Sequence, residues 1–164
     1  NLHMGTDHHE KARPYYLEAL DMLLELNDHR ALGILYNNIP LQDARKEQWD
    51  RADASFRLAL DHHRVVGNEE GLAVTYSQMG KSYLQRGELI GAERCLNNAS
   101  EHYVRLGHEQ AEAAVLRLLA SVYEQRLDAV SARRCHERVI MIDRRYRLPD
   151  EADDVRRLAR QPPS

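Results

Sequence analysis

Apolar residues recur at intervals of three and four along most of the chain, which is the spacing of amphipathic helices. The pattern stops at Gly67 and Gly107, where a helix is expected to end because glycine tolerates the left-handed closing conformation. Asp28 and Asn68 stand at the starts of the following segments, and both are good N-cap residues. Eight helices are predicted, near residues 8–26, 29–46, 48–66, 69–86, 88–106, 109–126, 128–146 and 150–160.

The pattern also repeats with a period of 40 residues and needs no insertion. Residues that stand 40 apart are called a column below. The columns of similar residues are Ala12, Ala52, Ala92 and Ala132; Tyr16, Phe56, Leu96 and His136; Ala19, Ala59, Ala99 and Val139; Tyr36, Tyr76 and Leu116; Ile39, Met79 and Leu119; and Pro40, Gly80 and Ala120. Each unit of 40 residues is therefore predicted to be a pair of antiparallel helices.

The stretch Tyr76-x2-Met79-Gly80-x2-Tyr83-x8-Ala92-x3-Leu96-x2-Ala99 resembles the tetratricopeptide repeat, with its alternating large and small packing positions. The neighbouring units match it with Leu119, Ala120, Tyr123, Ala132 and Val139, and with Ile39, Ala52, Phe56 and Ala59. The period of 40 is similar to that of the longer-helix variant found in cell-polarity scaffolds, kinesin light chains and bacterial regulators of the MalT and Rap type. The resemblance implies an all-α, right-handed superhelical solenoid of antiparallel helix pairs. It is strong evidence for the fold and weak evidence for the function.

The register divides the chain into a repeat array over residues 1–147 and a C-terminal capping helix over 148–160. The array is expected to hold a partial repeat and three full ones, at 1–27, 28–67, 68–107 and 108–147, and residues 161–164 to form a disordered tail. The first residues align with the end of a helix, so we expect a fragment of a larger protein with further repeats before it. The last helix has acids in its first turn and arginines at its close, as a polar cap should.

Proteins of this family bind ligands on the concave face that their first helices line. The positions expected there are Asn37, Asn38, Arg45, Ser77, Gln78, Lys81, Gln85, Arg117, Ser121 and Arg157. Amide side chains can bond the backbone of an extended peptide, and arginine can hold a carboxylate with two hydrogen bonds. The strip predicts a groove for a protein or peptide of acidic character. The alternative is a helix face that is polar only because it meets water.

Pro40 lies inside a predicted helix, where proline removes a hydrogen bond and clashes with the preceding turn. Three interpretations are open. The helix is bent and changes the curvature of the groove, the unit is broken into two short helices, or the proline is a hinge that opens on binding. We interpret the proline as a sign of sequence divergence in this repeat before a part of its mechanism, since Asp43 also replaces the usual tyrosine of its column.

Composition narrows the function classes. The 23 Lys and Arg against 26 Asp and Glu give a net charge of −3, which counts against nucleic-acid binding. No apolar run is long enough to cross a membrane. Two cysteines form no disulfide framework, so a reducing, cytoplasmic setting is expected, with Cys95 and Cys135 as small buried fillers. The abundance of arginine over lysine hints at a bacterial source.

Candidate chemistry is weak. The adjacent pair His62 and His63 points to different helix faces and cannot share one metal ion easily. No phosphate loop, catalytic triad or zinc spacing occurs, so neither an enzyme nor a cofactor is expected. Besides a peptide-binding module, two functions stay open. The resemblance allows a sensory domain of a bacterial signalling or transcription regulator, and the open N-terminal end allows a self-associating scaffold.

Overall fold

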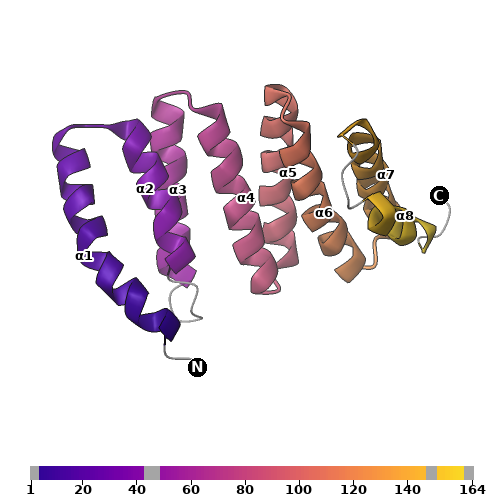
Figure 1. Cartoon of the computed structure of the whole chain (residues 1–164), viewed down its shortest axis with the longest axis horizontal. Helices are drawn as coiled ribbons and strands as arrows, with labels where there is room; N and C mark the ends of the chain where they lie inside the picture. The colour runs from indigo at the N-terminus through magenta and orange to yellow at the C-terminus, as the bar shows by residue number, and fades with distance from the viewer. Residues whose placement is uncertain (1–3, 43–48, 147–150, 161–164) are drawn as a thin grey trace. The chain divides into compact units, whose positions relative to one another are not determined.

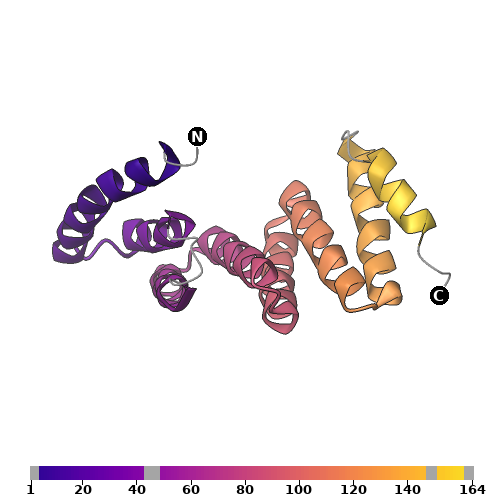
Figure 2. The same cartoon turned by 90° about the horizontal axis from the view of Figure 1, so that it is seen from below.

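The computed structural model describes the backbone of residues 4–42, 49–146 and 151–160, and the side chains of 14–38, 49–146 and 155–160. This described part consists of helices and contains no strand (Figures 1 and 2). The helices are α1 (Met4–Glu25), α2 (His29–Gln42), α3 (Trp49–Val65), α4 (Glu69–Gln85), α5 (Leu89–Leu106), α6 (Glu109–Gln125), α7 (Ala129–Tyr146) and α8 (Glu151–Ala159). They follow the predicted helices in order, and the all-α class is confirmed.

The chain divides into two compact units, residues 1–75 and 76–164. In the first unit, α2 packs against α3, and α1 packs against α2. In the second, α6 packs against α5 and α7, and α8 covers α7. None of the described helices combines the length and the apolar character that crossing a membrane requires.

Tight turns of one recurring type join the helices. After α5, the backbone N–H of His108 donates to the carbonyl of Tyr103 at 3.0 Å, and Gly107 adopts a positive φ of 70°. This is the Schellman closure, which satisfies carbonyls that the helix end leaves open. The same bond joins Asn68 to His63 at 2.8 Å. The next helix then starts after a short cap.

The predicted N-caps are confirmed. The Asp28 carboxylate accepts a hydrogen bond from the backbone N–H of Ala31 at 3.0 Å, and the Asn68 amide oxygen accepts one from Gly71 at 3.0 Å. His108, in the same column, makes no such bond. The short polar side chain therefore decides where the cap forms.

Small residues set the distance between the helices of the second unit. A Cβ atom on Gly80 would lie 2.5 Å from the Leu96 side chain, so α4 and α5 approach closely at this glycine. Ala92, Leu96 and Ala99 on α5 are fully buried. Val139 on α7, in the column of Ala99, is also fully buried. Both cysteines are buried, and neither forms a disulfide bond.

Helix α2 runs through Pro40 and ends at Gln42, so the proline does not terminate it. Residues 43–48, which include Asp43, lie outside the described part. The bend and the hinge that Pro40 could produce therefore stay predictions.

Candidate functional site

The predicted strip is best described on α4 and α6, each of which is the first helix of its 40-residue repeat. Its residues on these two helices all belong to the second compact unit. Lys81 and Gln85 on α4 are exposed, and Ser77 and Gln78 are half-buried. The spacing of Ser77, Lys81 and Gln85 places the three on one face of the helix. On α6, the half-buried Ser121 accepts a hydrogen bond from the Gln125 amide at 3.4 Å. Both helices thus present hydroxyl and amide groups at successive turns.

Arg117 has a structural partner. Its guanidinium lies 2.5 Å from a carboxylate oxygen of Asp143 on α7, and the Asp143 side chain is fully buried. The other oxygen of that carboxylate has no hydrogen-bond partner among the described residues. The Arg117 side chain keeps 22 % of its surface exposed, so one edge still faces outward. Its first role is to neutralise a buried negative charge.

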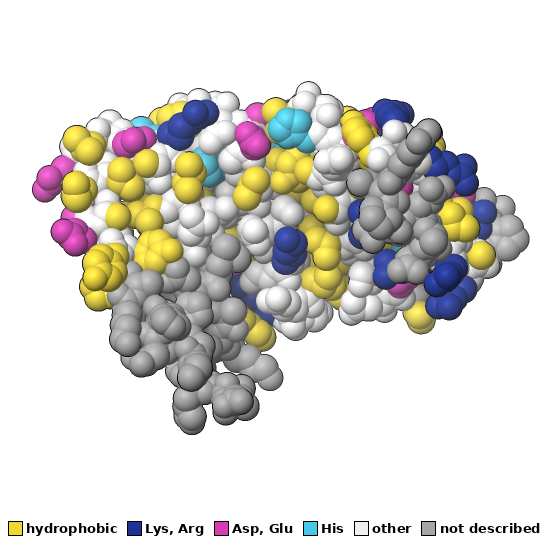
Figure 3. Space-filling model, viewed as in Figure 1, with side chains coloured by type: hydrophobic (Ala, Val, Ile, Leu, Met, Phe, Trp, Pro, Cys, Tyr) yellow, Lys and Arg dark blue, Asp and Glu magenta, His cyan; other side chains and the backbone are white. Residues whose placement is uncertain are grey.

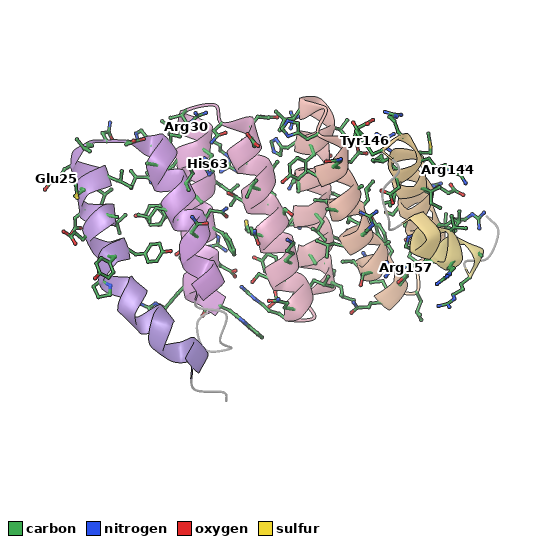
Figure 4. The ribbon with its side chains drawn as sticks, viewed as in Figure 1. Glu25, Arg30, His63, Arg144, Tyr146 and Arg157 are labelled. Atoms are coloured by element: carbon green, nitrogen blue, oxygen red, sulfur yellow. The ribbon has the colours of Figure 1, made fainter. Side chains whose placement is uncertain are left out.

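The remaining predicted residues belong to other parts of the chain. Asn37 on α2 is only 7 % exposed, whereas Asn38 beside it is exposed. Arg157 is exposed on α8, where Figure 4 labels it. Arg45 lies outside the described residues. The binding strip as a whole stays a prediction.

A cluster of histidines joins α2 to α3, which the sequence did not predict. The Nδ1 atoms of His29 and His62 lie 2.8 Å apart, a hydrogen-bond distance that requires one ring to donate and the other to accept. The His62 ring also stacks on Tyr36, with centroids 5.5 Å apart and planes within 3°. Burial and the neighbouring His29 lower the pKa of His62, partly offset by Asp61.

His63 lies next to this pair but is buried, at 1 % exposure (Figure 4). Glycines stand on both sides of its ring, since a Cβ on Gly33 or Gly71 would lie within 2.6 Å of it. Its Nδ1 lies 3.2 Å from the amide nitrogen of Asn68. Burial, and then the charges of His62 and Arg30, lower the pKa of His63. These effects favour the neutral form of the ring, which packs as a core group.

Charged pairs also fix α6 to α7. Glu112 is buried, with only 4 % of the residue exposed, and its carboxylate accepts two hydrogen bonds from Arg138 at 2.8 and 2.9 Å. Arg145 pairs with Glu109 one turn away. The signal for the first pair was in the sequence, because Glu112 interrupts a column of leucines. Within the described part of the chain, no three His, Cys, Asp or Glu residues are grouped to hold a metal ion.

No protein-family model matches the sequence, and no curated protein matches it. Among solved structures, the chain is similar to the crystal structure of BtubC (BKLC) from P. vanneervenii, with a TM-score of 0.78 and 27 % sequence identity. The match covers 92 % of this chain and 63 % of that one, so this chain spans less than two thirds of BtubC. BtubC is a tetratricopeptide-type protein similar to kinesin light chains. The comparison confirms a repeat fold of that type.

Proposed function

We propose that the chain is a protein-interaction module that binds an extended, acidic peptide segment along α4 and α6. The likeness to a tetratricopeptide-type structure supports this, because such folds generally mediate protein interactions. The observation that carries the proposal is the exposed Lys81 between amide and hydroxyl groups on one helix face. A single cation flanked by neutral polar groups suits a carboxylate on a polar backbone.

The roles follow from exposure. Lys81 would attract an acidic side chain, and Gln78 and Gln85 would bond the peptide backbone, since an amide both donates and accepts. Arg117 would contribute through its exposed edge only, because its guanidinium is already paired with Asp143. Arg157 on α8 would add an exposed positive charge to those of Lys81 and Arg117.

The test compares Lys81→Glu/Gln85→Glu with the wild-type chain as bait in affinity capture from native lysate, read by mass spectrometry. Arg94→Glu is the matched control, since Arg94 is an exposed cation on α5, outside the strip. The proposal expects a protein that wild type and the control retain and the double variant loses, with an acidic segment in that protein. A synthetic peptide of that segment should then bind wild type with an affinity at least about tenfold higher than the double variant.

Arg117→Glu is unsuitable for this experiment. It would leave the buried Asp143 carboxylate beside a second negative charge, and breaking a buried pair costs about 3–5 kcal/mol. Loss of binding would then report unfolding. Equal capture by wild type and Lys81→Glu/Gln85→Glu, with unchanged helicity, would contradict the assignment of the strip.

A further inference from the structure

Two histidines from different helices meet at the junction of α2 and α3. His29 begins α2 and His62 lies in the last turn of α3, and their Nδ1 atoms are 2.8 Å apart. Both residues are half-buried, and Figure 3 shows parts of histidine side chains at the surface near the upper ends of these helices. The pair is therefore open to small solutes, and it takes no part in the peptide strip on α4 and α6.

Packing fixes where the two rings stand. The His62 ring lies flat on Tyr36 of α2, with the ring planes 3° apart. His29 follows the cap residue Asp28, and its backbone N–H donates to the carbonyl of Asn27 at 3.1 Å. The centroids of the two imidazole rings are 5.0 Å apart. Because packed helices and a stacked ring hold both side chains, their nitrogens stand close together before any ligand arrives.

The hydrogen bond between the rings leaves them able to bind a metal ion. The accepting ring has a lone pair on Nδ1, and a neutral imidazole nitrogen is a common metal ligand. The donating ring becomes a ligand as well when its proton moves from Nδ1 to Nε2, which changes its tautomer and not its charge. One ion can then take the place of the shared proton without a net release of protons.

The distance between the two nitrogens selects the geometry of the ion. Neighbouring ligands at about 2.0 Å and at right angles are about 2.8 Å apart, as in the square-planar and tetragonal complexes of Cu²⁺ and Ni²⁺. Tetrahedral Zn²⁺ would hold them about 3.3 Å apart. The 2.8 Å between His29 and His62 therefore fits the tetragonal ions once the rings rotate to aim both lone pairs at one point. Of these ions, Cu²⁺ binds nitrogen ligands more tightly than Ni²⁺.

The neighbouring carboxylates already have partners. Asp28 caps α2 through the backbone N–H of Ala31, and Asp61 pairs with Arg64 at 3.1 Å. No third His, Cys, Asp or Glu joins the pair within the part of the chain that the structure describes. Two protein nitrogens leave the other coordination positions to water, so the site is open and its affinity is expected to be moderate.

The next repeat lacks this pair and supplies a matched control. His102 stands in the column of His62 and stacks on Tyr76 in the same way. The column of His29, however, holds Glu69 in that repeat. The same tyrosine and histidine thus occur there without a second histidine at the equivalent position.

We propose that His29 and His62 form a two-histidine binding site for a divalent transition-metal ion, with Cu²⁺ as the preferred ion. The bound ion joins the start of α2 to the end of α3 and stabilises the folded state, as any ligand does that binds this state alone. The site uses no residue of α4 or α6, so it is independent of peptide binding. Lys81→Glu/Gln85→Glu should therefore bind Cu²⁺ as wild type does.

The first test titrates Cu²⁺ alone into the chain and follows binding by calorimetry. His3, His8 and His9 are replaced by alanine in every protein compared, so that these N-terminal histidines do not contribute. This reference chain should bind one ion with a dissociation constant in the micromolar range, and Ni²⁺ and Zn²⁺ should bind more weakly. The ion should also raise the melting temperature of the chain.

Three variants of the reference chain locate the site. His62→Phe keeps an aromatic ring on Tyr36, and His29→Gln keeps a hydrogen-bonding side chain. Each should raise the dissociation constant for Cu²⁺ at least about tenfold and remove the rise in melting temperature. His102→Phe, the control, should bind as the reference chain does. Equal helicity of the four proteins without metal shows that the fold is intact.

Electron paramagnetic resonance of the Cu²⁺ complex gives a readout that a change in folding does not imitate. The reference chain and the control should show a tetragonal spectrum with coupling to two imidazole nitrogens, and either histidine variant should lose this coupling. The proposal is overturned if the reference chain binds no Cu²⁺ up to about 100 micromolar, or if His102→Phe weakens binding as much as His62→Phe does. Binding of Zn²⁺ as tightly as Cu²⁺ would overturn the tetragonal geometry.

Discussion

The pair of Glu112 and Arg138 tests how this array tolerates charge between its helices. The Glu112 side chain is 5 % exposed, and both of its oxygens accept hydrogen bonds from the Arg138 guanidinium. Removing one partner of a buried pair leaves an uncompensated charge, at a cost of about 3–5 kcal/mol. Because Arg138 is 37 % exposed, water screens part of this interaction. We therefore expect Arg138→Met to lower the free energy of unfolding by about 2–3 kcal/mol.

The chain contains its own apolar version of this pair. In the same two columns of the first unit stand Leu32, at 1 % exposure, and Leu58, at 42 %. Glu112→Leu/Arg138→Leu would therefore copy the residues that stand at the equivalent positions of α2 and α3. Replacing a buried ion pair by apolar residues is neutral or stabilising by about 1–4 kcal/mol, so we expect the double variant to be at least as stable as wild type.

The assay is urea unfolding followed by circular dichroism, with the midpoint and the slope compared for wild type, both single leucine variants, Arg138→Met and the double variant. The two single leucine changes and the double change form a cycle whose coupling energy should exceed about 2 kcal/mol. An Arg138→Met variant of wild-type stability would show that Glu112 is solvated in solution. A double variant as unstable as the singles would show that the site needs the pair for its packing.

Three further predictions concern single positions. Gly71→Ala should lower the free energy of unfolding by about 1–3 kcal/mol, because its Cβ would lie 2.4 Å from the His63 ring. The ring cannot move away easily, since Gly33 packs against it as well. An unchanged melting temperature in thermal unfolding would refute this close packing. The free energy of unfolding should fall as the pH drops below 6.5, the ordinary pKa of histidine, towards the lower pKa values of His62 and His63 in the folded state. The sign follows because the unfolded chain binds these protons first, and His62→Phe should weaken this dependence between pH 7.5 and 5. Leu127→Gly should raise stability by about 0.5–1 kcal/mol, since Leu127 is 91 % exposed at a φ of 59° that costs a non-glycine residue about 1–2 kcal/mol; a lower melting temperature would show that the leucine contributes more than its exposure indicates.

The helices of this chain could be predicted from sequence because local signals agree with one another. The apolar spacing, the glycine at 107 and the caps at Asp28 and Asn68 each mark a helix or its boundary without knowledge of a distant partner. The close approach at Gly80 was also predictable, because its column holds a proline, a glycine and an alanine. These features depend on residues within one turn or on the 40-residue period.

Partners across helices could not be predicted in the same way. Arg117 was placed on an open polar face, and its guanidinium in fact neutralises the buried Asp143. His62 was considered beside its sequence neighbour His63, whereas the structure brings it to His29 and Tyr36. Columns identify equivalent positions, but they do not say which columns of two antiparallel helices touch. That pairing depends on the register of the packed helices, which only the structure gives.

Once that register is known, the irregular columns can be explained in pairs. Glu112 breaks a column of leucines, and Arg138 breaks the column that faces it. Asp143 stands in the column of His63 and Tyr103, and its carboxylate pairs with the guanidinium of Arg117. In both cases the exchange of a neutral residue for a charge on one helix is matched on the other helix of the same unit, because a lone buried charge would cost several kcal/mol. We therefore expect that the residues of two facing columns can be exchanged together between one 40-residue repeat and another. Exchanging the residue of one column alone would leave an unpaired charge. Such paired exchange lets successive units differ in surface and charge while the spacing of their helices is kept.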